Sequence, residues 1–207
     1  MTAGTTPGGE AAAEQMITAL AGWPAARSGV LVVAIDGHGT AGKSTVAGRV
    51  AGLTGAALVH TDDFFHGQPV PPRRQPLHRY YDWRRIRAQA LEPLRARHTA
   101  AFRRFDWNRG AGLDGLVTVA PANLILLEGV FSAAPELSDL VDRSVFVDTP
   151  EPERLRRLRA QVTPEDWDAD WLASEQSYFR LIRPVASFDL IVSGTDPVPA
   201  GRSGGTS

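Results

Sequence analysis

The sequence predicts an α/β domain in which helices flank a parallel five-stranded sheet. Five short apolar runs alternate along the chain with stretches of helical periodicity, a pattern typical of parallel sheets with crossover helices. The 207 residues, 43% of them hydrophobic, suffice for one domain with a sizeable core. Gly37, Asp62 and Glu128 directly follow three of the apolar runs. Because the carboxyl ends of parallel strands share one edge of a sheet, we expect these three residues to meet there.

The helices and strands are expected in a simple alternating order. Strands are expected at residues 30–36, 56–61, 123–127, 144–147 and 188–192. Helices are expected at residues 10–22, 45–53, 82–98, 152–161 and 177–183. Irregular or polar connections are expected at residues 66–79, 99–121 (irregular or a hairpin) and 162–177. The Gly-, Thr-, Pro- and Ser-rich ends, 1–9 and 194–207, are expected to be disordered tails around one domain at 10–193.

The segment after the first strand fits a phosphate-binding loop. Residues 37–44 match G-x-x-x-x-G-K-[ST] between a buried strand and a helix, which predicts the P-loop NTPase fold and ATP binding. Its glycines let backbone N–H groups face phosphate oxygens, and the helix N-terminus adds positive partial charge. Lys43 is expected to reach the β- and γ-phosphates, and the Ser44 hydroxyl to ligate Mg²⁺. The residues expected to hold the nucleotide are Gly37, His38, Gly39, Thr40, Ala41, Gly42, Lys43, Ser44 and Thr45.

Lys43 is the only lysine, and the other 21 of the 22 basic residues are arginine. An ammonium is a compact point charge on a flexible stem, which a guanidinium fork does not replace. This favours a functional role for Lys43, although compositional bias could also have left one lysine by chance. His38 occupies a variable position of the loop, where we expect it to act as a spacer.

Carboxylates follow two further strands. Residues 124–128 are four apolar residues and an acid, the Walker B pattern with Glu128 in place of the usual aspartate. Glu128 is expected to hold Mg²⁺ directly or through water, the alternative being a solvated carboxylate. Asp62 and Asp63 follow the second strand, where one carboxylate can accept the proton of an attacking hydroxyl. Adjacent side chains diverge, so only one is expected in the site. We favour Asp62, and Asp63 stays the alternative.

The chain resembles the uridine kinase-like group of P-loop kinases over roughly residues 28 to 195. The motifs that support this resemblance lie in family order at 35–37, 42–45, 62–65 (like D-x-F-[YF]), 81–82 (like [FY]-D), 105–109 (like Y-D-[FW]…R) and 128–130. The resemblance implies transfer of the ATP γ-phosphate to a small hydroxyl compound, with Asp62 as general base and Ser44 and Glu128 on the metal side. It also implies acceptor contacts from Phe65, Tyr81, Asp82, Phe105, Trp107 and Arg109.

Phe105 departs from the family pattern, which usually has tyrosine there. This removes a possible hydrogen bond and counts against uridine itself. The acceptor that the resemblance implies is a nucleoside, with another small alcohol, such as a vitamin precursor or a sugar, as the alternative. A nucleotide-binding regulatory or nucleic-acid-associated NTPase is the hypothesis from another class.

The resemblance also implies that the basic stretch after the fourth strand forms a lid over ATP at about 152–184. Arginine there would neutralise charge on the transferred group. Arg154 and Arg157 share one helical face, and Arg156 and Arg159 share another, so one pair is expected to face the phosphates. The family pattern favours Arg157 as the catalytic arginine.

Composition excludes several other classes. The chain has no cysteine, hence no disulfide or Cys-based metal site, and a net charge of −1. Residues 73–109 carry 11 arginines against three acids, which could suit nucleic acid, but a solvated helix face is the commoner explanation. No apolar run spans a bilayer and no secretory signal is recognisable. We therefore expect a cytoplasmic protein without membrane or nucleic-acid partners, and the oligomeric state stays open.

Overall fold

The computed structural model describes residues 9–24, 29–66, 80–161 and 169–195. Its central element is a five-stranded sheet in the order β2-β5-β1-β6-β7, and every pairing in it is parallel. The strands are β1 (Leu31–Asp36), β2 (Ala57–His60), β5 (Leu124–Glu128), β6 (Arg143–Asp148) and β7 (Leu190–Ser193). The predicted α/β fold class is thus confirmed.

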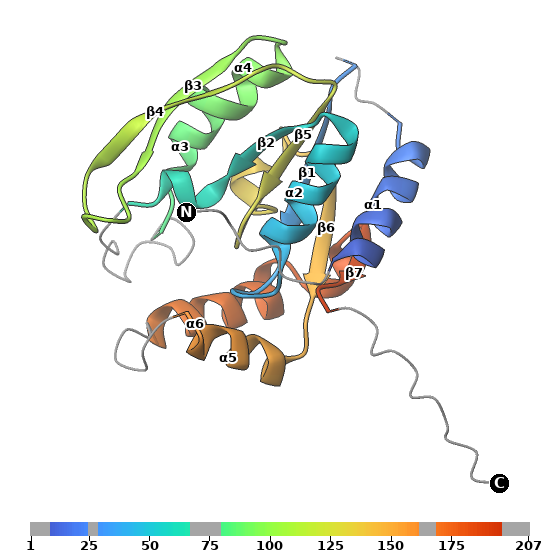
Figure 1. Ribbon diagram of the computed structural model, residues 1–207, viewed down its shortest axis with the longest axis vertical. Helices are drawn as coiled ribbons and strands as arrows, with labels where there is room; N and C mark the ends of the chain where they lie inside the picture. Colours follow the sequence, from blue (N-terminus) through green and yellow to red (C-terminus); the bar gives the residue numbers. More distant parts are fainter. Residues whose placement is uncertain (1–8, 25–28, 67–79, 162–168, 196–207) are drawn as a thin grey trace, which may run out of the picture.

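Helices cover both faces of this sheet (Figure 1). In β1, alternate side chains point to opposite faces and all are buried, as expected for the central strand of a parallel sheet. One face packs against α1 (Glu10–Gly22) and α2 (Lys43–Thr54), and α1 also contacts the edge strand β7. The other face packs against the helical segment at 83–95 and the aromatic residues near the carboxyl edge.

The helical segment at 83–95 consists of α3 (Trp83–Arg85), a π-helical stretch (Ile86–Leu91) and α4 (Glu92–Arg95). Pro93 has no N–H to donate to the carbonyl four residues earlier, which accounts for the wider helical register just before it. The helix was expected to reach residue 98 but ends at Arg95, because Arg97 adopts a left-handed backbone with φ of 61°. It is followed by the antiparallel hairpin of β3 (Ala100–Phe105) and β4 (Leu113–Val119), the second of the two predicted alternatives.

The carboxyl edge of the sheet is covered by α5 (Glu151–Arg159) and α6 (Ala169–Ser177), drawn in orange in Figure 1. A π-helical stretch, Tyr178–Ile182, continues directly from α6. The sequence showed only that residues 162–177 are acidic and polar, and the structure forms α6 from residue 169 on. Trp171, Glu175 and Tyr178 share one face of this helix and pack inward, which outweighs the polar composition.

Two strand boundaries also differ from the prediction. The second strand ends at His60, because Thr61–Phe64 form a 3₁₀ helix. The last strand begins at Leu190 rather than at residue 188, after a 3₁₀ turn over Val185–Ser187. The predicted tails lie mostly outside the described residues. At the described start of the C-terminal tail, the N–H of Gly194 donates to the carbonyl of Asp148 over 2.6 Å.

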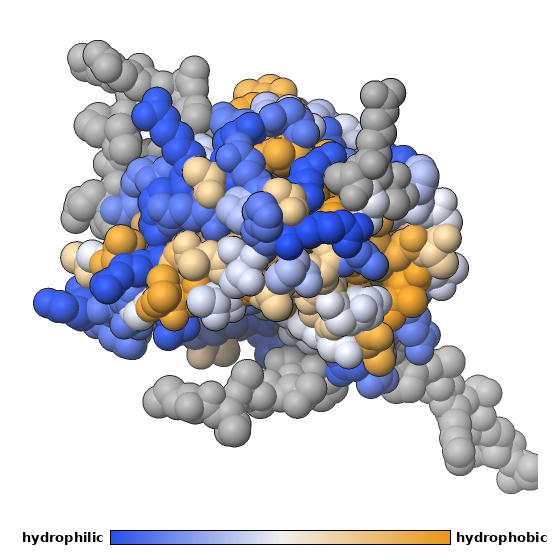
Figure 2. Space-filling model, turned by 90° about the horizontal axis from the view of Figure 1, so that it is seen from above, coloured by the Kyte–Doolittle hydropathy of each residue, from blue (hydrophilic) through white to orange (hydrophobic). Residues whose placement is uncertain are grey.

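Many arginines of the basic stretch pair with acids of the same chain. Arg87 contacts Asp139 at 2.6 Å, and Arg95 contacts Asp142 at 3.1 Å. Figure 2 shows hydrophilic side chains interspersed with smaller apolar groups over one face of the molecule. Among the described helices, none has the length and apolar character that crossing a bilayer requires.

Candidate active site

At two positions of the phosphate loop the backbone adopts a conformation that favours glycine. Gly37 has a φ of 144°, and a Cβ there would lie 2.6 Å from the carbonyl oxygen of Val147. Gly42 has a φ of 96° and caps the N-terminus of α2. The loop therefore turns tightly at the carboxyl end of the central strand, with the N-terminus of α2 directed at it.

Thr40 is the strained residue of this loop, with a φ of 60°. Hydrogen bonds with residues of α5 hold it in place. Its hydroxyl lies within hydrogen-bond distance of the carbonyls of Gly39 and Arg154, and its own carbonyl accepts from Arg157 Nη1 over 3.2 Å. Arg157 also donates to the carbonyl of Gly194, so the Arg154–Arg157 face of α5 lies on the loop. Arg156 is exposed and pairs with Glu153 instead.

Lys43 is almost fully buried, and its ammonium donates to the carbonyl of His38 over 2.7 Å. The lysine thus spans the loop from its C-terminal to its N-terminal half. Ala41 is also buried, and its carbonyl accepts from the Thr149 hydroxyl over 2.8 Å. These contacts fix the loop as one unit.

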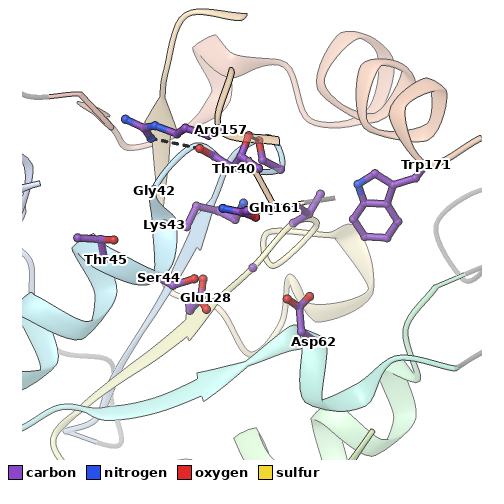
Figure 3. A pocket seen from close by; sticks show the side chains of 13 residues that line it. Thr40, Gly42, Lys43, Ser44, Thr45, Asp62, Glu128, Arg157, Gln161 and Trp171 are labelled. Atoms are coloured by element: carbon purple, nitrogen blue, oxygen red, sulfur yellow. Dashed lines mark hydrogen bonds between the residues drawn. The ribbon is translucent and has the colours of Figure 1, made fainter. Parts of the chain in front are cut away.

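A cavity of about 440 Å³ opens beside the loop (Figure 3). The phosphate loop, the ends of β2 and β5, and the region of α5 and α6 all contribute to its wall. Its lining residues are Gly39, Thr40, Gly42, Lys43, Ser44, Thr45, Asp62, Glu128, Gly129, Val130, Arg157, Gln161 and Trp171. The structure thus brings the predicted base, metal and lid residues to one place.

Asp62 faces the cavity from the side opposite the loop. The hydroxyl of the buried Tyr81 donates to its Oδ1 over 2.7 Å. Burial raises the pKa of Asp62 above its ordinary value, although the bond from Tyr81 acts in the opposite direction. Asp63 points elsewhere, into a second pocket between β2 and the hairpin. The two carboxylates therefore diverge, as adjacent side chains do.

Glu128 lies at the end of β5 and is nearly buried. In the sheet register it pairs with His60 of β2, whose Nδ1 lies 2.5 Å from Glu128 Oε1. This hydrogen bond raises the pKa of His60. The next residue, Gly129, has a φ of 140°, and a Cβ there would lie 1.8 Å from the Thr61 hydroxyl. The ends of β2 and β5 thus approach each other more closely than any residue other than glycine at position 129 would allow.

The oxygens near the loop fit Mg²⁺. This hard cation binds through one or two protein oxygens together with substrate phosphates and water. Ser44 and Glu128 supply a hydroxyl and a carboxylate to the same cavity. Within the described part of the chain, no cluster of three or more His, Asp or Glu could hold a metal alone. A metal shared with nucleotide phosphates is the arrangement that suits these ligands.

The predicted acceptor residues divide into two groups. Phe65, Phe105 and Trp107 form an aromatic cluster with ring centroids 4.8 to 5.1 Å apart, and Phe65 also meets the ring of Tyr81. Tyr81 donates a hydrogen bond to Asp62, so the aromatic cluster lies next to the predicted base. Outside it, Asp82 accepts from the N–H of Arg85 and caps α3, and the side chain of Arg109 is 83% exposed.

Two buried acids were missed as site residues. Asp36 Oδ1 accepts from the N–H groups of Gly37 and Phe131, and its Oδ2 accepts from the N–H of Ala133 and the hydroxyl of Tyr178. It therefore ties the start of the phosphate loop to the loop after β5. The second acid, Glu175 of α6, accepts from the N–H of Gly39 over 3.0 Å. The i, i+4, i+7 spacing of 171, 175 and 178 was a signal for the latter.

We expect Asp36 to make the stability of the protein depend on pH. Burial raises its pKa from 3.8 to about 6, against the effect of the backbone N–H groups and Lys43. The folded-state pKa exceeds the unfolded value, so the protonated carboxyl group of Asp36 stabilises the fold. Its contribution to the free energy of unfolding is complete below pH 3.8 and is lost as the pH rises through about 6. The shift of roughly two units corresponds to about 3 kcal/mol.

Asp36→Asn removes this titration. Although the variant is less stable because the N–H of Ala133 loses its acceptor, the wild type's advantage should shrink by about 3 kcal/mol between pH 4 and pH 7. Urea unfolding of both proteins across this range measures the difference. A constant difference would contradict the assigned pKa.

Comparisons with known proteins agree with this geometry. A solved structure of a possible uridine kinase from Bacillus stearothermophilus superposes with a TM-score of 0.65 at 20% identity, covering 86% of this chain and 96% of the other. The chain has the P-loop kinase fold. Curated proteins named uridine kinase from Shewanella frigidimarina and Shewanella denitrificans are 25% and 24% identical over 169 residues, covering 75% of this chain and 79% of theirs. No family model matches the chain.

The resemblance to uridine kinases is thus confirmed in sequence and in fold. Together these relatives indicate a P-loop kinase. The strand order, with the phosphate loop after the central β1, places the cavity at the carboxyl edge where such folds bind ligands.

Proposed function

We propose that this P-loop kinase transfers the γ-phosphoryl group of ATP to a hydroxyl of a small molecule, a nucleoside above all. The observation that supports this most is one cavity lined by the phosphate loop, Glu128 and Asp62. A nucleotide site alone would not require a buried carboxylate on the far wall. A kinase does, because the acceptor hydroxyl must lose its proton during transfer.

In this proposal Asp62 accepts the hydroxyl proton. Its raised pKa makes it a better proton acceptor than an ordinary aspartate, and Tyr81 holds one carboxylate oxygen so that the group is oriented towards the cavity. Lys43 and Arg157 supply positive charge beside the phosphates. Mg²⁺, when bound by Ser44 and Glu128, would neutralise phosphate charge.

The acceptor is proposed to lie between Asp62 and the aromatic cluster of Phe65, Phe105 and Trp107. Trp107 is 57% exposed, so one face of its ring is available to a planar group. The named relatives favour a nucleoside. Phe105 lacks the hydroxyl of the tyrosine usual in that family, which favours an acceptor other than uridine and keeps another small alcohol as the second candidate.

Trp107→Ala should raise the KM for a nucleoside acceptor about tenfold and leave the KM for ATP unchanged, since stacking on one ring contributes about 1–3 kcal/mol. Leu116→Ala, at an exposed position of the same hairpin, is the matched control. Steady-state kinetics with each substrate varied in turn measure the two KM values. Equal changes in both KM values would contradict an acceptor site at Trp107.

A screen for ADP release over nucleosides, sugars and other small alcohols tests the proposed function. A kinase should release little ADP without an acceptor and much more with the right one. ADP release that ignores every small alcohol and rises with nucleic acid would support the alternative NTPase. The internal pairing of Arg87 and Arg95 with acids argues against that alternative.

A further inference from the structure

The buried carboxylate of Glu175 joins helix α6 to the phosphate loop. Its Oε1 accepts from the N–H of Gly39 and from Trp171 Nε1, and its Oε2 lies 3.1 Å from His38 Nδ1. The side chain is 1% exposed and lies outside the set of residues that line the cavity. Glu175 therefore contacts the loop without being placed to contact the phosphates.

A second contact from the same helical face supports this connection. Tyr178, one turn after Glu175, donates to Asp36, which in turn accepts from the N–H of Gly37. Two N–H groups of the loop, those of Gly37 and Gly39, are thus fixed by buried carboxylates. The first carboxylate belongs to β1, but the second comes from a helix that is remote in sequence.

We propose that Glu175 is a positioning residue of the donor site, which holds the Gly39–Thr40 peptide in the orientation that phosphate binding requires. The proposal rests on the proposed function, because it assumes that the loop binds a nucleoside triphosphate. Gly39 has no side chain to restrict its backbone and Thr40 is strained, so without Glu175 the Gly39 end of this peptide would have to be ordered when the nucleotide binds. Ordering it beforehand removes that entropic cost from binding.

Glu175 also carries a charge near Lys43. Burial would raise its pKa, but the hydrogen bond with His38 and the charge of Lys43 outweigh this, and the pKa lies below the ordinary value. A purely electrostatic role would therefore depend on the negative charge, whereas the positioning role depends on where the acceptor oxygen lies. Two conservative variants separate these roles.

Glu175→Gln keeps the shape and loses the charge. Its amide oxygen can accept from Gly39 and Trp171 while its NH₂ donates to His38 Nδ1 in the other tautomer. Glu175→Asp keeps the charge but withdraws the carboxylate by one methylene. Positioning predicts that the Gln variant binds nucleotide within about threefold of the wild type, and that the Asp variant binds about tenfold more weakly because the N–H of Gly39 loses its acceptor.

The experiment is calorimetric titration of the full-length variants with the non-hydrolysable ATP analogue AMP-PNP and Mg²⁺, accompanied by thermal melts. Gln176→Ala, at the exposed neighbouring position, is the control and should bind as the wild type does. If the Asp variant binds like the wild type, or the Gln variant is the weaker of the two, the positioning role is wrong. A wild type that binds no AMP-PNP would instead contradict the proposed function.

Discussion

Asp62→Asn is expected to lower the rate of phosphoryl transfer by about 10²- to 10⁴-fold while nucleotide binding stays within about threefold of the wild type. The substitution keeps the volume of the side chain, and the amide oxygen can still accept from Tyr81. What is lost is the ability to take a proton. The effect should therefore appear in kcat and not in the dissociation constant for ATP.

The matched control is Asp63→Asn, which changes the adjacent carboxylate that points into a different pocket. Its transfer rate should stay within a few-fold of the wild type. In the wild type, activity should also decline as the pH falls through the raised pKa of Asp62, and this decline should be absent in the residual activity of Asp62→Asn. Unchanged transfer by Asp62→Asn, or a larger loss in Asp63→Asn, would remove Asp62 from the role of base.

Gly129→Ala is expected to destabilise the protein by about 3 kcal/mol or more, which for a domain of this size lowers the melting temperature by roughly 10 °C. The new Cβ would lie 1.8 Å from the Thr61 hydroxyl and 3.0 Å from its Cβ, at a backbone φ of 140°. Since Thr61 precedes Asp62 and Gly129 follows Glu128, relief of the clash must move Asp62, the proposed base, away from Glu128, the proposed metal ligand. Activity should fall more than stability alone explains.

Thr61→Ala supplies the internal control for this steric argument, because it removes the hydroxyl nearest to the added Cβ. The double variant should be more stable than the sum of the two single changes predicts, by about 1 kcal/mol or more. Chemical unfolding of the four proteins measures this coupling. Strict additivity would show that the contact between residues 61 and 129 is not the cause.

Features that depend on local sequence pattern could be predicted from the chain. The alternation of apolar runs with helical stretches predicted the parallel sheet, and the loop motif predicted the turn between β1 and α2. The acids at strand ends were expected to meet because strand direction alone brings them to one edge. Asp62 and Glu128 accordingly line one cavity, although their roles stay predictions.

Features that depend on long-range packing could not be predicted. Gly39 and Glu175 are 136 residues apart, and nothing in either neighbourhood specifies the other. The acceptor contact of Tyr81 stays a prediction, but the hydrogen bond from its buried hydroxyl to Asp62 could not be predicted, because Asp62 lies in a 3₁₀ turn that the sequence pattern did not indicate. The pairing of His60 with Glu128 likewise follows from strand register, which the sequence does not reveal.

Transfer of the γ-phosphoryl group to a small molecule is tested most directly with γ-³²P-labelled ATP and the best acceptor from the screen. The measurement is the distribution of ³²P between the acceptor and inorganic phosphate. The label should appear in the acceptor in a one-to-one ratio with ADP, and Asp62→Asn should form neither product at an appreciable rate. Label released as inorganic phosphate at the same rate with and without the acceptor would contradict the assignment of this protein as a small-molecule kinase.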